Sequence, residues 1–227
     1  MRAPSSARVG GFTLIELSIV VAIAVVLTAI ALPAFKSATG RANQAKCISN
    51  LREISSALSF FSMENNGEYP RTQTFGTGGS TSWEFEGGFW FNALGDYLAE
   101  HRRFDRTKVA TGPFPQKIPF ACGAAKPHGW GKAGIDVGLN GYILKAGNVS
   151  EPRVRNVNIV SPSKTLMVAD SNDKWQIGNS ANFVTDGISF RHNGTANVIF
   201  FDGHVSQIRK SQLADPVFLA ELGGRRN

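Results

Sequence analysis

Cysteine is scarce in this chain, whose 227 residues include only Cys47 and Cys122. The two do not form the C-x-x-C spacing of many metal and redox sites. In a protein exported to an oxidising compartment, two cysteines separated by a long loop can form a disulfide. Two separate buried thiols fit the sequence equally well, so the sequence leaves both interpretations open.

Charge is also sparse, since charged residues make up 18% of the chain, yet the formal net charge is +7. A positive surplus of this size could favour anionic partners. The basic residues are scattered rather than clustered, which is typical of solvated surface. We therefore expect no nucleic-acid partner, and the length suggests one domain plus an anchor.

Ionisable residues are almost absent from residues 12–32, where Glu16 is the only one. As a helix rising about 1.5 Å per residue, this stretch would measure about 31 Å. That length matches the hydrocarbon core of a bilayer. The sequence therefore predicts a transmembrane helix at residues 12–33, in contact with membrane lipid.

A removable secretory signal is the alternative interpretation of this stretch. Arg2 and Arg8 would form its basic region, and Ala29-Ile30-Ala31 has the small-x-small form of a cleavage site. However, the apolar run is longer than a typical signal and contains a carboxylate. Both features favour a retained helix.

Glu16 disfavours insertion of this helix into a membrane, because inserting a carboxylate at the centre of a membrane helix costs about 2.5–3.5 kcal/mol. No cation lies within the same stretch. If the chain is cut between Gly11 and Phe12, Phe12 carries a new α-ammonium group. On a neighbouring copy shifted along the helix axis, this group could meet Glu16. Such head-to-tail contacts generate open helical assemblies.

Residues 11–16, Gly-Phe-Thr-Leu-Ile-Glu, resemble the processing site of type IV pilins and type II secretion pseudopilins. The resemblance implies that a prepilin peptidase cuts after Gly11 and methylates the nitrogen of Phe12, which makes residues 1–11 a leader peptide. It also implies that Glu16 neutralises the N-terminus of an adjacent subunit during assembly. The implied function is a structural subunit of a pilus-like filament, a pseudopilin of a type II secretion system, and not an enzyme.

The same resemblance implies the partners and the location of the chain. Its partners would be identical or homologous pilin subunits, the peptidase and an inner-membrane assembly platform. It would cross the bacterial inner membrane once, with a cytoplasmic N-terminus before processing and a periplasmic head that can be drawn into a filament. Basic residues are more numerous after the apolar stretch than before it, so the positive-inside rule does not favour this orientation. We let the processing motif decide.

A second helical pattern covers residues 34–66. Its apolar positions recur at intervals of four, three, four and three, as on one face of an amphipathic helix: Cys47, Leu51, Ile54, Leu58 and Phe61. We place Asn50 on the opposite face. The helix should end at residues 64–67, Glu-Asn-Asn-Gly, because Asn and Gly accept the left-handed backbone of a C-cap.

The remaining residues, 67–227, are expected to form a globular head. Residues 165–170 read as a buried strand. Asn193-Gly194 and Asp202-Gly203 are preferred type I′ hairpin turns between apolar runs, and they predict a three-stranded antiparallel meander over residues 187–209. The expected fold is therefore α+β, a long N-terminal helix packed on an antiparallel sheet.

His192, nine further residues and Asp202-Gly203 resemble the prepilin-associated H-X9-DG domain, which belongs to type II secretion or pilus-like systems. That family's usual Cys-Pro is Cys122-Gly123 here. On the hairpin interpretation, His192 and Asp202 lie at opposite ends of a strand, about 20 Å apart. This separation is too long for a catalytic dyad.

Asp170, Asn172 and Asp173 offer clustered oxygens that could bind calcium, but they do not form a full ligand set at defined spacing. We therefore expect no cofactor and name no metal ligands. Two other functions stay open. The chain could be a membrane-anchored periplasmic enzyme or binding module that uses Asp170, Asp202 or His204. It could also be a minor pilin that binds DNA or surfaces through a contiguous basic patch.

Overall fold

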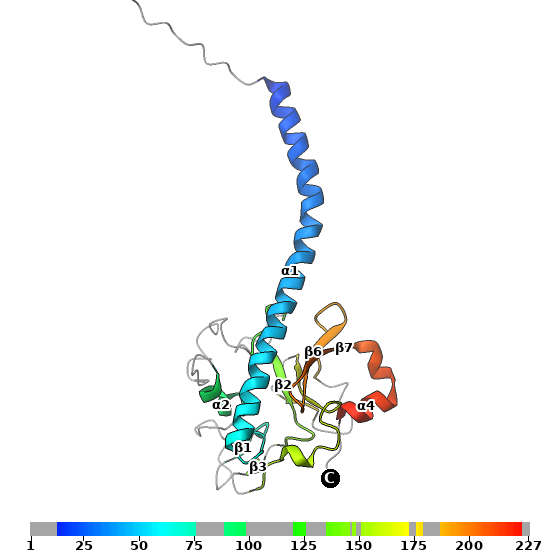
Figure 1. Ribbon diagram of the computed structural model, residues 1–227. Coiled ribbons are helices and arrows are strands. Elements are labelled where there is room, and N and C mark those ends of the chain that lie inside the picture. The colour runs from blue at the N-terminus through cyan, green and yellow to red at the C-terminus, as the bar shows by residue number, and fades with distance from the viewer. Residues whose placement is uncertain are drawn as a thin grey trace, which may run out of the picture. The chain divides into compact units, whose positions relative to one another are not determined.

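A computed structural model describes residues 13–75, 89–98, 120–125, 135–145, 147–148, 151–172, 176–178 and 187–223. The chain divides into two compact units, Met1–Ala42 and Asn43–Asn227. Helix α1, Leu14–Glu64, runs through the boundary between them (Figure 1). The processing residues Gly11 and Phe12 lie outside the described residues, as does Asp173.

The second half of α1 forms one wall of the head. The predicted apolar stripe is confirmed, and the buried face also includes Ser55, Ala57 and Ser62. Asn50 does not lie on a purely solvated face as we expected. It is half-buried, because its side-chain amide donates to the carbonyl of Ala121 at 2.8 Å. The polar side chain is therefore used as a tertiary contact.

The end of α1 matches the sequence pattern. The helix stops at Glu64, and both Asn66 (φ 54°) and Gly67 (φ 79°) adopt the left-handed backbone. The amide of Gly67 donates to the carbonyl of Ser62 at 2.8 Å, a 6→1 bond of the kind that closes helix C-termini.

The head is built on a five-stranded sheet in the order β5-β2-β4-β6-β7. The strands are β2 (Val137–Asn140), β4 (Leu166–Asp170), β5 (Gln176–Ile177), β6 (Thr195–Phe200) and β7 (Val205–Arg209). The β2–β5 pair is parallel and the other pairs are antiparallel. The α+β class predicted from the sequence is therefore confirmed, with one parallel pair added.

Shorter elements complete the described chain. These are β1 (Thr74–Phe75), which pairs in parallel with β3 (Gly147–Asn148), α2 (Trp90–Ala93), the 3-10 turns η1 (Gly95–Tyr97), η3 (Asn156–Asn158) and η4 (Lys210–Ala214), and α4 (Pro216–Gly223).

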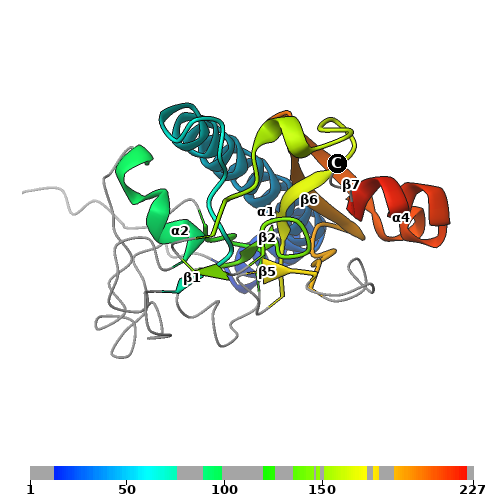
Figure 2. The same ribbon diagram turned by 90° about the horizontal axis from the view of Figure 1, so that it is seen from below.

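The sheet is covered on both faces, as Figure 2 shows. Along β6, Ile199 belongs to the buried cluster that includes Leu51 and Leu58 of α1, whereas Val198 belongs to the cluster that includes Leu222 of α4. This alternation follows from the two-residue period of a strand. Polar residues at the same alternate positions as Ile199, including Asp170 and Asn197, therefore lie on the face toward α1.

The predicted three-stranded meander over residues 187–209 is wrong in its first strand. Residues 187–192 make only the isolated bridges Ser171↔Ile188 and His192↔Thr195, and β4 occupies the place beside β6. The turn itself is as predicted, because Asn193 (φ 53°) and Gly194 (φ 81°) both have positive φ. The segment leaves the ladder because the amide of Ser189 donates instead to the carbonyl of Asp170 at 2.8 Å.

The β6–β7 hairpin is correct, but its predicted type I′ turn is wrong. Only Gly203, at φ 89°, has positive φ there. The amide of Gly203 donates to the carbonyl of Phe200 at 2.9 Å, and Phe200 donates to the carbonyl of His204 at 3.0 Å. A longer connection with a single left-handed glycine thus replaces the two-residue turn.

Candidate functional site

The first candidate site is the exposed apolar surface at the start of α1. Residues 13–42 are exposed throughout, and the helix is long and apolar enough to cross a membrane. Twelve large apolar side chains between residues 14 and 32 are each at least 53% exposed: Leu14, Ile15, Leu17, Ile19, Val20, Val21, Ile23, Val25, Val26, Leu27, Ile30 and Leu32. Full burial of one such side chain is worth about 1.5–3 kcal/mol. This surface therefore requires lipid or protein around it.

Glu16 lies in the first turn of this helix and forms a capping box with Thr13. Its Oε2 accepts the backbone N–H and the hydroxyl of Thr13, both at 2.9 Å. In return, the amide of Glu16 donates to Thr13 Oγ1 at 3.3 Å. The Thr-x-x-Glu pattern is a known helix-start signal that our sequence interpretation did not use. Both bonds use Oε2, so among the described residues they leave Oε1 for a further partner.

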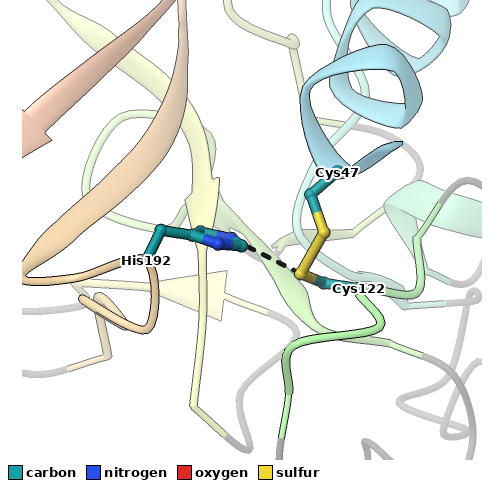
Figure 3. A group of neighbouring side chains, drawn as sticks. All are labelled: Cys47, Cys122 and His192. Atoms are coloured by element: carbon teal, nitrogen blue, oxygen red, sulfur yellow. Dashed lines mark hydrogen bonds between the residues drawn. A yellow bond between two sulfur atoms is a disulfide. The ribbon is translucent and has the colours of Figure 1, made fainter. Parts of the chain in front are cut away.

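The second candidate site is a buried group around the Cys47–Cys122 disulfide. This disulfide joins α1 to residues 120–125, with a Cα–Cα distance of 5.3 Å. The Nε2 atom of His192 lies 3.5 Å from Cys122 Sγ (Figure 3) and 3.4 Å from Oδ2 of Asp170. All four side chains are buried.

Asp170 is held in this group by the start of β6. Its Oδ2 accepts the backbone N–H of Asn197 at 2.8 Å. Burial raises the pKa of Asp170 to about 6, although nearby Arg191 and the amides of Asn197 act to lower it. Burial and the neighbouring Arg191 lower the pKa of His192. At neutral pH the imidazole is therefore neutral, and its contact with Asp170 is a polar contact rather than an ion pair.

Arg191 links the start of β2 to the end of β4 by hydrogen bonds. Its guanidinium donates to the carbonyl oxygens of Asp136 and Ser171 and to Oγ of Ser189. Asp136 Oδ2 in turn accepts the amide of Cys122 at 2.8 Å. The loop that carries Cys122 is thus fixed to the sheet by hydrogen bonds as well as to α1 by the disulfide.

Comparison with known proteins found relatives among pilus proteins. Over about a third of its length, the chain is similar to pilus proteins. It is 43% identical to a fimbrial protein of Neisseria meningitidis serogroup B over 77 residues, which are 34% of this chain and 44% of that protein. It is 42% identical over 77 residues to the type IV narrow pilus major component of Thermus thermophilus, covering 33% of this chain and 66% of that protein.

A second fimbrial protein, from Neisseria meningitidis serogroup A, is 44% identical over 64 residues, or 28% of this chain and 37% of that protein. The matches thus span less than two thirds of each of these relatives. No protein-family model and no solved structure matches the chain.

His192 and Asp202, the residues that carry the H-X9-DG resemblance, do not contact each other. His192 lies in the buried group, whereas Asp202 binds His204 at the far end of β6, with Oδ1 2.6 Å from Nδ1. The His204 ring also stacks on Phe200, with centroids 4.4 Å apart. A His192–Asp202 dyad is therefore not formed.

The polar residues that we suggested for an enzyme do not form one cluster. Leu166 pairs with Phe200 and Ala169 pairs with Val198, so Asp170 and Asp202 lie at opposite ends of the β4–β6 ladder. Asp170 is 1% exposed and its described partners are protein groups. The proposed calcium cluster includes Asp173, which lies outside the described residues.

Proposed function

We propose that this chain is a structural subunit of a pilus-like filament, in which the first part of α1 packs against the same part of other copies. The observation that carries the proposal is the run of twelve exposed apolar side chains with Glu16 as its one carboxylate. The similarity to fimbrial proteins and to a type IV pilus component supports it. In the membrane, lipid covers this surface, and in the filament, neighbouring subunits replace the lipid.

The proposal includes the processing step implied by residues 11–16. Cleavage after Gly11 gives Phe12 an α-ammonium group next to Thr13, and methylation of that nitrogen leaves it positively charged. Within one chain, Glu16 Oε2 is already bound to Thr13. Oε1 can therefore accept the Phe12 ammonium of a neighbouring copy. A buried carboxylate is tolerated when such a partner offsets its desolvation.

The orientation follows from the same step. The peptidase acts at the cytoplasmic face of the inner membrane, so the N-terminus is cytoplasmic before cleavage and the head is periplasmic. A disulfide such as Cys47–Cys122 suits an oxidising compartment, which supports a periplasmic head. The assembly platform of the inner membrane would then move the subunit from lipid into the filament.

Two kinds of filament fit this subunit. The H-X9-DG resemblance favours a pseudopilus of a type II secretion system, whereas the relatives are described as fimbrial and pilus proteins. Deletion of the gene distinguishes them. Loss of exported proteins with surface pili intact indicates a secretion pseudopilus, and loss of surface fibres indicates a pilus.

A subunit of this kind catalyses no reaction. The separation of Asp170 from Asp202 supports a structural role for the polar residues of the head. The competing function is an enzyme or binding module on a pilin-type anchor. In that case the purified chain would bind a ligand saturably or turn over a substrate.

Mass spectrometry of the protein purified from its native membrane tests the proposal. We expect a mature chain that begins with N-methylated Phe12 and that is recovered in sheared filaments. A native chain that begins at Leu32, or that keeps residues 1–11 in functioning cells, would contradict it.

A further inference from the structure

The group around the disulfide has the composition of a metal site. The sulfur atoms of Cys47 and Cys122 and a ring nitrogen of His192 lie within 4.8 Å of one another, and all three residues are buried. Figure 3 shows the imidazole pointing at the sulfur atoms from the side opposite α1. Asp170 adds a carboxylate oxygen 3.4 Å from His192 Nε2. No local pattern predicts this group, because consecutive members are at least 22 residues apart in the sequence.

We propose that, when the disulfide is reduced, Cys47, Cys122 and His192, whose ligand atoms all lie within 4.8 Å of one another, bind one Zn²⁺ ion. Asp170, whose carboxylate lies beside His192 but outside this group of three, turns toward the ion as its fourth ligand. Two thiolates, one imidazole and one carboxylate are all ligands that zinc takes in protein sites. Structural zinc sites are tetrahedral and closed to solvent. The four side chains are at most 5% exposed, so the site is closed in the same sense.

The distances in the structure already match two edges of such a tetrahedron. With Zn–N about 2.0–2.1 Å, Zn–S about 2.3 Å and Zn–O about 2.0–2.2 Å, the nitrogen–sulfur edge is about 3.6 Å and the nitrogen–oxygen edge about 3.4 Å. The observed separations are 3.5 Å from His192 Nε2 to Cys122 Sγ and 3.4 Å from His192 Nε2 to Asp170 Oδ2. The two sulfur atoms must separate to about 3.8 Å, which rotation of the cysteine side chains can provide.

Hydrogen bonds already position these ligands. The amide of Asn197 holds Asp170 Oδ2 at 2.8 Å, and Asp136 holds the amide of Cys122 at 2.8 Å. Outer partners of this kind orient the ligands of metal sites and strengthen binding. The positive charge of Arg191 lies 3.9 Å from the carboxylate that holds Cys122, measured from Nη1 to Asp136 Oδ1.

Replacing the disulfide by zinc leaves the charge of the buried group unchanged. A dithiol reductant gives two electrons and two protons to the disulfide and becomes a disulfide itself. Zn²⁺ then displaces the two protons from the cysteine thiols, which are released to solvent. The neutral disulfide is thereby exchanged for one Zn²⁺ and two thiolates, which also sum to zero, so the exchange adds no net buried charge.

The consequence is a link between α1 and the Cys122 loop in either redox state. The oxidised chain carries this link as a covalent bond, and the reduced chain carries it through the metal. Only the reduced chain has free thiolates to bind zinc. Because a ligand that binds the native state raises its stability, zinc should stabilise the reduced chain and not the oxidised one.

Cobalt titration of the full chain in detergent tests this inference. The chain is compared after oxidation and after reduction by a phosphine in the absence of oxygen, with Co²⁺ as the spectroscopic probe. We expect one equivalent of Co²⁺ to bind the reduced chain, with the visible bands of tetrahedral cobalt and a thiolate charge-transfer band, and Zn²⁺ to displace it. We expect neither band from the oxidised chain, and we expect Zn²⁺ to protect both cysteines of the reduced chain from alkylation.

His192→Gln and His204→Gln are matched variants for the ligand assignment. His204 is partly exposed and bound to Asp202, so His204→Gln should bind Co²⁺ like the natural chain. His192→Gln should weaken binding by more than the about 10–100-fold that loss of an outer partner costs. If His192→Gln fails to fold, metal binding is judged from the charge-transfer band and the alkylation protection of the natural chain. Equal binding by oxidised and reduced chains, undiminished binding by a folded His192→Gln chain, or no saturable binding by the reduced chain would overturn the inference.

Discussion

The hydroxyl of Ser55 on α1 donates to the carbonyl oxygen of Gly203 at 2.7 Å. Gly203 is at one end of β6, and His192, just before the other end, lies against the disulfide that anchors Cys47 of α1. Cys47 and Ser55 are about 12 Å apart along the helix. The two ends of the His-to-Asp-Gly spacing are thus both connected to α1, one by the Ser55 hydrogen bond and the other through Cys122 and its disulfide.

The Ser55 contact predicts a loss of stability that a neighbouring serine does not share. Ser55→Ala removes this hydrogen bond from the part-buried Gly203 carbonyl, which costs about 0.5–1.5 kcal/mol. Ser56→Ala is the control, because among the described residues the Ser56 hydroxyl donates to the carbonyl of Arg52 on the exposed face of the same helix. Thermal unfolding should show a lower Tm for Ser55→Ala alone. Equal Tm values for the two variants would show that the Ser55–Gly203 hydrogen bond does not stabilise the head.

The disulfide should contribute a large share of the stability of the head. Cys47 and Cys122 are 75 residues apart, and closing a loop of that size in the unfolded chain is worth about 4 kcal/mol. Changing both cysteines to serine should lower the unfolding free energy by about this amount, measured by denaturant titration with zinc-free buffer. A loss below about 1 kcal/mol would mean that residues 120–125 are held by their hydrogen bonds instead.

Local pattern was sufficient to predict α1, β4 and the β6–β7 hairpin. The intervals of three and four along residues 47–61 and the Asn-Asn-Gly ending are properties of adjacent residues, and the structure follows them. The partner of β6 was not predictable in this way. The Asn193-Gly194 turn is formed, but β6 pairs with β4, 25 or more residues earlier, because the continuously buried β4 fits the centre of the sheet better than residues 187–192 do.

The buried polar group shows why the second site could not be predicted. Asp136, Asp170 and Arg191 come from three segments far apart in the sequence. These segments come together only when β2, β4 and β6 pair. The scattered basic residues were expected on the solvated surface, yet the Arg191 side chain is 7% exposed and donates to the carbonyl oxygens of Asp136 and Ser171. By contrast, Glu16 and Thr13 are three residues apart in the sequence, so their capping box could have been predicted from the Thr-x-x-Glu pattern alone.

Asp170 predicts a specific pH dependence of stability. Its pKa is raised by burial from 3.8 to about 6, so the folded chain holds the proton more tightly than the unfolded chain does. Its contribution to folding is therefore fully present below about pH 4 and is lost as the pH rises through about 6, by about 3 kcal/mol. In Asp170→Asn this dependence disappears. Unfolding free energies measured from pH 4 to 7 should fall in the natural chain relative to Asp170→Asn, and parallel curves would contradict the assignment.

Two variants at the start of α1 separate helix capping from assembly. Glutamine at position 16 can still complete the capping box but carries no charge, whereas Thr13→Ala removes the Thr13 hydroxyl from the cap and keeps the carboxylate. If Glu16 acts only as a cap, Thr13→Ala should be the more damaging change. If it pairs with the Phe12 ammonium of a neighbouring copy, Glu16→Gln should be the more damaging change, because a buried cation without its partner costs about 3–5 kcal/mol.

The amount of this subunit in sheared filaments from cells that make either variant tests the central claim most directly. Membrane-bound, processed subunit is measured in parallel as the reference for each strain. If Glu16 pairs with the Phe12 ammonium of a neighbouring copy, Glu16→Gln should be processed normally, with filament recovery reduced by about a hundredfold or more. Thr13→Ala should give near-normal filaments. Filaments of Glu16→Gln at the level of the natural chain would contradict this pairing.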